Sequence, residues 1–255
     1  MDIFHSVIFG VVEGVTEFLP ISSTGHLILV ADLLRIPQDA FTKSFEIIIQ
    51  LGAITSVAVL YWRSFLNIDI LKKLIVAFIP TGIVGLLLYK TIKTYLIGNE
   101  TVVLWSFVLG GLSLIAFELS HKEPQDATAK VSNITYKQAV AVGVFQSIAV
   151  IPGVSRSAAT IFGGLYLGFK RSVIVEFSFL LAVPTMLAAS GLDIYKNYST
   201  FSSNDALILS VGFIVSFVVA LATIKFLLSY IREHNFIPFG IYRIAVAFIF
   251  WVAVL

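Results

Sequence analysis

Long apolar runs separated by short polar segments make up most of this chain. Six of the runs approach or exceed the roughly 20 residues that an α-helix needs to cross a bilayer. They lie at about 44–62, 74–89, 101–119, 173–192, 206–231 and 238–255. The pattern predicts an all-α polytopic membrane protein with six transmembrane helices.

Two regions break this pattern. Residues 3–35 form two short apolar pieces interrupted at "FLPISSTGH", and residues 136–169 form two pieces interrupted at "AVIPGVSRSAAT". Pro20 and Pro152 lie in the interruptions, and proline ends helices because it lacks the backbone N–H. Each piece is too short to cross a bilayer comfortably. We therefore expect two re-entrant helix pairs, each entering and leaving the membrane on one side.

The two interrupted regions align with each other. The alignment sets Gly10 on Gly143, Glu13 on Gln146, Ser22 on Ser155 and Ser23 on Arg156. A weak repeat with paired interrupted helices indicates an inverted-topology architecture. We predict one membrane domain, 1–255, whose halves, 1–120 and 136–255, are joined by a polar linker at 121–135.

Composition and charge support a membrane protein and limit its chemistry. The chain is 58% hydrophobic and 13% charged, whereas soluble domains carry about 25% charged residues. It has no cysteine and no basic cluster of the kind that binds nucleic acid. Lys and Arg in the short loops favour a topology in which the first hairpin enters from outside and the second from inside. The two polar interruptions then meet near the midplane.

Glu13 and Glu17 are four residues apart, so they share one helix face. Neighbouring carboxylates repel each other unless one is protonated or a cation joins them, and Mg²⁺ and Ca²⁺ prefer carboxylate oxygens. We expect a divalent cation on this pair, because ionisable residues inside a membrane are costly and usually functional. The alternative is that both glutamates pair with basic residues or lie at the membrane surface.

Ser22 and Ser23 follow Pro20 and open the next helix, with His26 on its first turn. Serine is a common N-cap, which alone could explain one of them. A helix N-terminus also suits phosphate, because its backbone N–H groups are free. His26 is suited to act as a base, an acid or a nucleophile near neutral pH, although a lone histidine is often structural.

The second interruption repeats this design and adds Arg156. A guanidinium binds phosphate oxygens bidentately and keeps its charge. At membrane depth it needs an anion, either a bound phosphate or one of the two glutamates.

Four further polar residues surround Arg156 in the sequence. Ser155 or Ser157 is expected to cap the helix, Thr160 lies one turn beyond Arg156, and Gln146 is placed to hydrogen-bond either loop. Together with the first interruption, these residues predict a metal-assisted phosphate site.

The motifs "EGVTEFLPISSTGHL" and "PGVSRSAATI" closely resemble the two signature motifs of the bacterial undecaprenyl pyrophosphate phosphatase, or bacitracin-resistance, family. "FEIIIQLGA" and "EFSFLLAVP" also resemble segments of that family, so the resemblance covers essentially the whole chain. Ala158 departs from it, since the family often has glycine at this position.

The resemblance implies an enzyme with six transmembrane helices and two re-entrant helix pairs, often a homodimer, in the bacterial plasma membrane. It implies removal of the terminal phosphate of undecaprenyl diphosphate, from the extracytoplasmic face and with a divalent cation. That reaction recycles the lipid carrier for peptidoglycan synthesis and confers bacitracin resistance.

The resemblance also implies roles by position. The matching residues are Glu13, Glu17, Ser23, His26, Ser155, Arg156 and Thr160. The two glutamates match an acidic motif linked to metal binding and catalysis, and the last three match the phosphate-binding loop. Ser23 and His26 match residues proposed, in competing schemes, as nucleophile or general base.

We expect Ser23 to attack the terminal phosphorus with assistance from His26. Attack by His26 itself, by an activated water or by Ser22 stays open. A lipid flippase or transporter is the main alternative function, because interrupted helices in inverted repeats are a transporter architecture. A purely structural membrane protein would not explain Arg156 or the paired glutamates.

Overall fold

The computed structural model describes residues 1–91, 95–96, 99–124, 126–197 and 205–253. Within these ranges the regular elements are helices, and one isolated bridge joins Thr128 to Phe169. The helices are α1 (Ile3–Thr16), α2 (Ser23–Leu33), α3 (Ala40–Leu60), α4 (Trp62–Phe65), α5 (Ile68–Leu87), α6 (Tyr89–Thr91), α7 (Glu100–Ser120), η2 (Val131–Asn133), α8 (Tyr136–Gln146), η3 (Ser147–Val150), α9 (Arg156–Tyr166), α10 (Arg171–Asn197), α11 (Ala206–Tyr230) and α12 (Ile237–Ala253).

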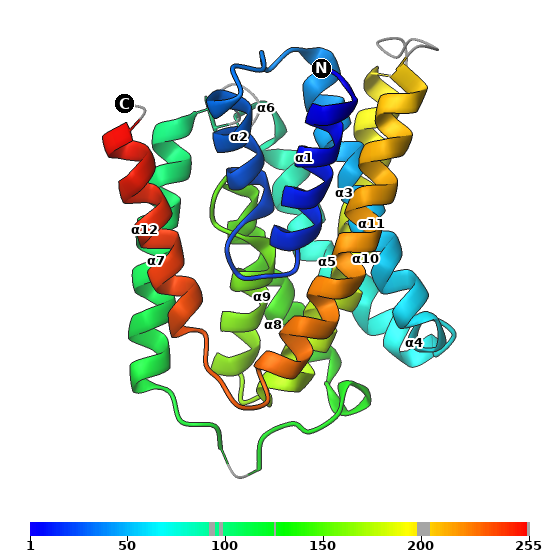
Figure 1. Ribbon diagram of the computed structural model, residues 1–255. Coiled ribbons are helices and arrows are strands. Elements are labelled where there is room, and N and C mark those ends of the chain that lie inside the picture. The colour runs from blue at the N-terminus through cyan, green and yellow to red at the C-terminus, as the bar shows by residue number, and fades with distance from the viewer. Residues whose placement is uncertain (92–94, 97–98, 125, 198–204, 254–255) are drawn as a thin grey trace.

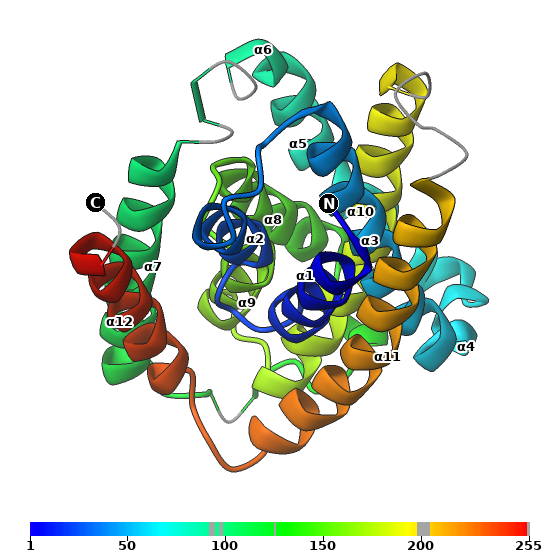
Figure 2. The ribbon, with the colours of Figure 1, turned by 45° about the horizontal axis from the view of Figure 1, so that its top comes forward.

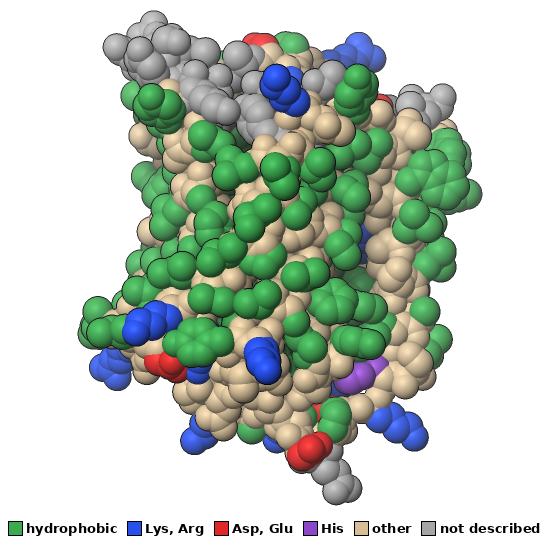
Figure 3. Space-filling view, turned by 180° about the vertical axis from the view of Figure 1, so that it is seen from behind, with side chains coloured by type: hydrophobic (Ala, Val, Ile, Leu, Met, Phe, Trp, Pro, Cys, Tyr) green, Lys and Arg blue, Asp and Glu red, His purple; other side chains and the backbone are tan. Residues whose placement is uncertain are grey.

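Five of the described helices are long and apolar enough to cross a membrane. They contain the segments Phe41–Leu60, Ile68–Leu87, Glu100–Ser120, Arg171–Leu192 and Ala206–Tyr230. The sixth expected span corresponds to α12, which has 17 described residues and runs beside α7 (Figure 1). Seen from behind, hydrophobic side chains cover the middle of the molecule, and charged side chains gather mainly near its ends (Figure 3). The structure is therefore that of a multi-pass membrane protein.

Both interrupted regions fold as pairs of short helices, as the sequence predicted. The pairs α1–α2 and α8–α9 occupy the centre of the molecule, and the longer helices surround them (Figure 2). The turn between α1 and α2 lies at mid-height, and α2 rises from it while α9 descends (Figure 1). Polar backbone at such a depth needs partners within the protein.

The two short pairs have the same local geometry. Helix α9 begins at Arg156, the residue that the alignment sets on Ser23, where α2 begins. Ser22 (φ 71°) and Ser155 (φ 76°) are the N-caps, and each hydroxyl accepts a hydrogen bond from the backbone N–H three residues later. A left-handed φ is uncommon outside glycine, so both turns are held by their surroundings.

Close helix packing fixes where each pair lies. A Cβ on Gly10 of α1 would be 2.8 Å from the carbonyl oxygen of Gly212 in α11. A Cβ on Gly143 of α8 would be 2.0 Å from that of Ala77 in α5. Glycine lets helices in membranes approach this closely. Each short pair therefore packs on a long helix from the other half of the chain.

Candidate functional site

An ion pair joins the two interruptions. Arg156 Nη2 donates to Glu17 Oε1 at 2.9 Å, and the two side chains are 12% and 5% exposed. Ser23 Oγ donates to the other oxygen, Glu17 Oε2, at 2.5 Å. Of the two glutamates that the sequence offered to Arg156, Glu17 is the one that it contacts. One carboxylate thus connects the guanidinium and the serine hydroxyl.

A second contact holds the Arg156 guanidinium through its other terminal nitrogen. Its Nη1 donates to the carbonyl oxygen of Ser178 in α10 at 2.7 Å. The Ser178 hydroxyl lies 2.6 Å from Thr160 Oγ1, which is 3.0 Å from the Arg156 carbonyl oxygen. Thr160 therefore links the backbone of Arg156 to Ser178, the residue whose carbonyl oxygen accepts the bond from the guanidinium. Ser178 was not predicted as a site residue, although it lies in the "EFSFLLAVP" segment.

The two loops also touch directly. Ser157 Oγ donates to the carbonyl oxygen of Leu19, at 2.8 Å, and lies 3.0 Å from Ser155 Oγ. Ser155 is the N-cap of α9. Of the two serines that the sequence offered as caps, Ser155 has that role and Ser157 reaches across to the first loop.

Arg243 of α12 ties both loops to the rest of the bundle and was missed at the sequence level. Its side chain is fully buried. The carbonyl oxygens that accept its hydrogen bonds are those of Pro20 (3.3 Å), Gly153 (2.7 Å), Val154 (3.0 Å) and Ser106 (2.7 Å). The signal was available, because an arginine inside the apolar run "FGIYRIAVAF" is costly unless its donors are satisfied.

Both ring nitrogens of His26 have partners. Nδ1 lies 2.7 Å from the carbonyl oxygen of Ser22, and Nε2 lies 2.9 Å from the hydroxyl of Tyr242 in α12. The described residues contain no hydrogen bond between His26 and Ser23, whose partner is Glu17. The structure thus pairs Ser23 with a carboxylate, where the sequence had suggested the imidazole.

Gln146 does not hydrogen-bond either loop, so that expectation was wrong. Its Nε2 donates to Thr81 Oγ1 of α5 at 2.8 Å and to Thr185 Oγ1 of α10 at 3.3 Å. The side chain leaves α8 on the face that packs against α5, because Gly143, one turn earlier, holds the two helices close together. Gln146 therefore helps to fix the second short pair in the bundle.

Glu13 differs from Gln146, its counterpart in the repeat. Its carboxylate is fully buried, and neither oxygen has a hydrogen-bond partner among the described residues, whereas the amide nitrogen of Gln146 has two. Glu17 lies one helical turn later, with its backbone N–H bonded to the Glu13 carbonyl oxygen. A buried carboxylate without partners is costly, so these two residues fit a hard cation. Because the described residues contain no group of three or more His, Cys, Asp or Glu suited to a metal, its other ligands would be water and substrate oxygens.

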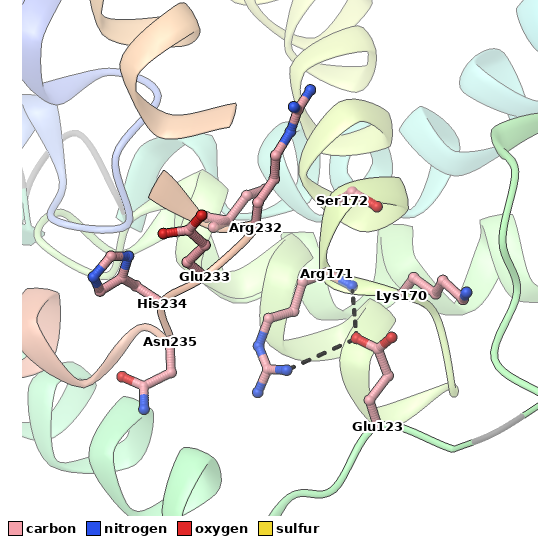
Figure 4. Close-up of a pocket in the computed structure, with 9 residues that line it drawn as sticks. Glu123, Lys170, Arg171, Ser172, Arg232, Glu233, His234 and Asn235 are labelled. Atoms are coloured by element: carbon pink, nitrogen blue, oxygen red, sulfur yellow. Dashed lines mark hydrogen bonds and ion pairs between the residues drawn. The ribbon is translucent and has the colours of Figure 1, made fainter. Parts of the chain in front are cut away.

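The pocket shown in Figure 4 lies elsewhere. It has a volume of about 560 Å³ and lies where the loop after α9 meets the loop between α11 and α12. Its charged lining includes Lys170, Arg171, Arg232 and Glu123, and Arg171 is paired with Glu118 at 2.6 Å. None of the predicted site residues lines this pocket. The loop site itself is buried, so a substrate needs an opening between helices.

Two opposed short helix pairs thus place an arginine, two glutamates and two serine-capped helix N-termini together inside a multi-pass membrane protein. This combination suits the binding of an anionic, phosphate-like group. The chain matches the family described as bacitracin resistance protein BacA over residues 6–249. It belongs to that family.

Several relatives are similar over their full length. An undecaprenyl-diphosphatase of Wolinella succinogenes is 53% identical over 251 residues, covering 98% of this chain and 97% of the relative. One from Persephonella marina is 50% identical over 256 residues, covering 100% of both chains. One from Aquifex aeolicus is 49% identical over 251 residues, covering 98% of both.

Proposed function

We propose that this chain is an undecaprenyl-diphosphatase, which hydrolyses the terminal phosphate of undecaprenyl diphosphate and releases the lipid monophosphate. Family membership and full-length relatives with this name support the activity. The observation that supports the site is the set of Arg156, Glu17 and Ser23, in which one buried carboxylate bonds both the guanidinium and the serine hydroxyl.

Arg156 and the two helix N-termini hold the diphosphate. In the structure described here the guanidinium is neutralised by Glu17 at 2.9 Å. A phosphate that enters between the loops offers the same guanidinium two further oxygens, a geometry that arginine favours. The free backbone N–H groups at the starts of α2 and α9 add donors for these oxygens.

Ser23 attacks the terminal phosphorus. Its proton passes to Glu17 Oε2, the atom that already accepts its hydrogen bond. The bond from phosphorus to the bridging oxygen breaks, and undecaprenyl phosphate leaves with the electron pair. Water then hydrolyses the phosphoserine and restores Ser23. His26 supports the first loop through its bond to the Ser22 carbonyl oxygen.

Glu13, together with Glu17, would hold a divalent cation such as Mg²⁺ or Ca²⁺. The unpartnered oxygens of Glu13 support this assignment. When bound, the cation would neutralise charge that develops on the phosphate oxygens.

The protein is proposed to lie in the bacterial plasma membrane as an inverted repeat, with its site open to the extracytoplasmic side. The chain has no cysteine, so single-cysteine labelling tests this directly. Pro37 is exposed in the loop between α2 and α3, and Asn133 is exposed in η2. The α2–α3 loop and the green segment that leads into α8 lie at opposite ends of the bundle (Figure 1). A membrane-impermeant thiol reagent added to intact cells is expected to label Pro37→Cys and not Asn133→Cys. Labelling of Asn133→Cys alone would reverse the orientation.

The activity is tested by phosphate release from undecaprenyl diphosphate by the purified protein, with added Mg²⁺ or Ca²⁺ and with a chelator. We expect release that depends on the cation. A folded protein that binds the lipid and moves it across vesicle membranes without releasing phosphate would instead be a flippase.

A further inference from the structure

A tyrosine from the last helix reaches into the first loop. The Tyr242 hydroxyl lies 2.9 Å from His26 Nε2, and the two rings stack with planes 8° apart and centroids 5.6 Å apart. Phe107 of α7 also packs against the imidazole, with its centroid at 5.2 Å. Only Tyr242 and the Ser22 carbonyl group make hydrogen bonds to this ring among the described residues.

The partners of His26 define one tautomer. The Ser22 carbonyl oxygen can only accept a hydrogen bond, so the proton must be on Nδ1. In a neutral imidazole Nε2 then carries the lone pair, and the Tyr242 hydroxyl is the donor to it. If that donor were absent, the proton could move to Nε2. Nδ1 would then present a lone pair to the carbonyl oxygen and repel it.

This matters because the Ser22 backbone needs support. Ser22 has φ 71°, in the left-handed region that serine rarely adopts. It is the N-cap of α2 and the neighbour of Ser23. The bond from Nδ1 of His26 is therefore one of the contacts that keep the serine pair in its observed place.

We propose that Tyr242 is a positioning residue for the reaction. Its hydroxyl holds His26 in the Nδ1–H tautomer, and His26 in turn holds the Ser22 carbonyl group and the attacking Ser23 in place. This proposal rests on the proposed function, because it assigns Ser23 the attacking role. Tyr242 acts through His26 and does not touch the phosphate.

The packing of α12 places the tyrosine at the correct depth. A Cβ on Gly240 would be 2.7 Å from the Gly111 carbonyl oxygen, and one on Gly111 would be 2.6 Å from that of Gly240. Arg243, the next residue after Tyr242, bonds both loops. Helix α12 thus supports the two loops and the histidine from adjacent positions.

The test compares Tyr242→Phe with Tyr230→Phe. Both substitutions keep the ring and remove only the hydroxyl. Tyr230 is a matched control because its ring stacks on His234, with centroids 4.5 Å apart, in the loop that lines the other pocket. Protein with ¹⁵N-labelled histidine reports the His26 tautomer, and His26→Asn identifies its signals among the four histidines. Phosphate release gives kcat and KM.

We expect Tyr242→Phe to move the His26 signals away from the pure Nδ1–H tautomer and to lower kcat about tenfold with little change in KM. Tyr230→Phe should change neither. Unchanged His26 signals in Tyr242→Phe would overturn the proposal, and so would a changed tautomer with kcat within twofold of wild type. If wild type releases no phosphate, the proposed function fails and the catalytic half of this proposal fails with it. The NMR result still decides whether Tyr242 holds His26.

Discussion

The two short helix pairs share one backbone design but differ in charge. Each begins its second helix at a serine cap with a left-handed φ, and each packs through a glycine on a long helix of the other half. Where α1–α2 has Glu13 and Ser23, α8–α9 has Gln146 and Arg156. In the proposed mechanism the first pair supplies the carboxylates and the nucleophile, and the second supplies the guanidinium that binds phosphate. The repeated backbone thus brings opposite charges together at one site.

The largest expected effect comes from Glu17→Gln, because Glu17 connects the two pairs. Glutamine cannot take the proton of Ser23, so we expect kcat/KM for phosphate release to fall about 10³-fold. Glu118→Gln is the control, since it breaks another ion pair, with Arg171 at 2.6 Å, outside the site. Glu17→Gln protein that keeps more than a tenth of wild-type activity would contradict the assigned role.

Arg243→Met removes the residue that bonds both loops at once. Hydrogen bonds to charged groups contribute about 1.5–3 kcal/mol each, so we expect the free energy of unfolding to fall by at least about 3 kcal/mol. Thermal unfolding in detergent reports this loss of stability as a lower Tm. Arg63→Met is the control, because Arg63 is exposed. Equal Tm values for the two variants would show that Arg243 does not hold the loops.

Exchanging the acid and the amide of the two pairs tests the cation site. Glu13→Gln should raise the cation concentration for half-maximal activity at least about tenfold, as losses at metal sites commonly do. Gln146→Glu should leave it unchanged, since that side chain bonds Thr81 and Thr185 away from the loops. Titration of activity with Mg²⁺ or Ca²⁺ measures both. The same cation dependence in Glu13→Gln and wild type would remove Glu13 from the site.

The smallest effects concern the two caps. Alanine at position 22 or 155 loses the cap and keeps a left-handed φ, whereas glycine loses only the cap. We expect each alanine variant to be less stable than the matching glycine variant by about 1 kcal/mol. Chemical unfolding in detergent gives the difference. A glycine variant that is less stable than its alanine partner would argue against the strained turn.

The sequence predicts the local features of this site well. The serine and proline residues at the interruptions are local signals, so the two short pairs and the alignment of Ser23 with Arg156 could be read before the structure. Spans were predicted from apolar runs alone, which explains why α12, with 17 described residues, was counted with the longer ones.

Contacts between distant segments were not readable in the same way. Tyr242 and His26 are 216 positions apart, and Arg243 meets Pro20 across 223. An arginine inside an apolar run signals a need for partners, but only the packing of α12 shows that the partners of Tyr242 and Arg243 lie in the two loops. The Ser23–Glu17 bond was missed for a different reason. His26 follows Ser23 in the same helix, so the sequence suggested that the two side chains meet. In the structure the His26 ring instead bonds Tyr242 of α12, and the Ser23 hydroxyl bonds Glu17.

The most direct test of the central claim is a double-mutant cycle on kcat/KM for phosphate release, with Glu17→Gln, Arg156→Gln and the double variant. If the two pairs form one site, the losses are strongly non-additive, and the double variant is about as active as either single one. Losses that multiply would mean that Glu17 and Arg156 act independently, which would contradict a single site shared between the two loops.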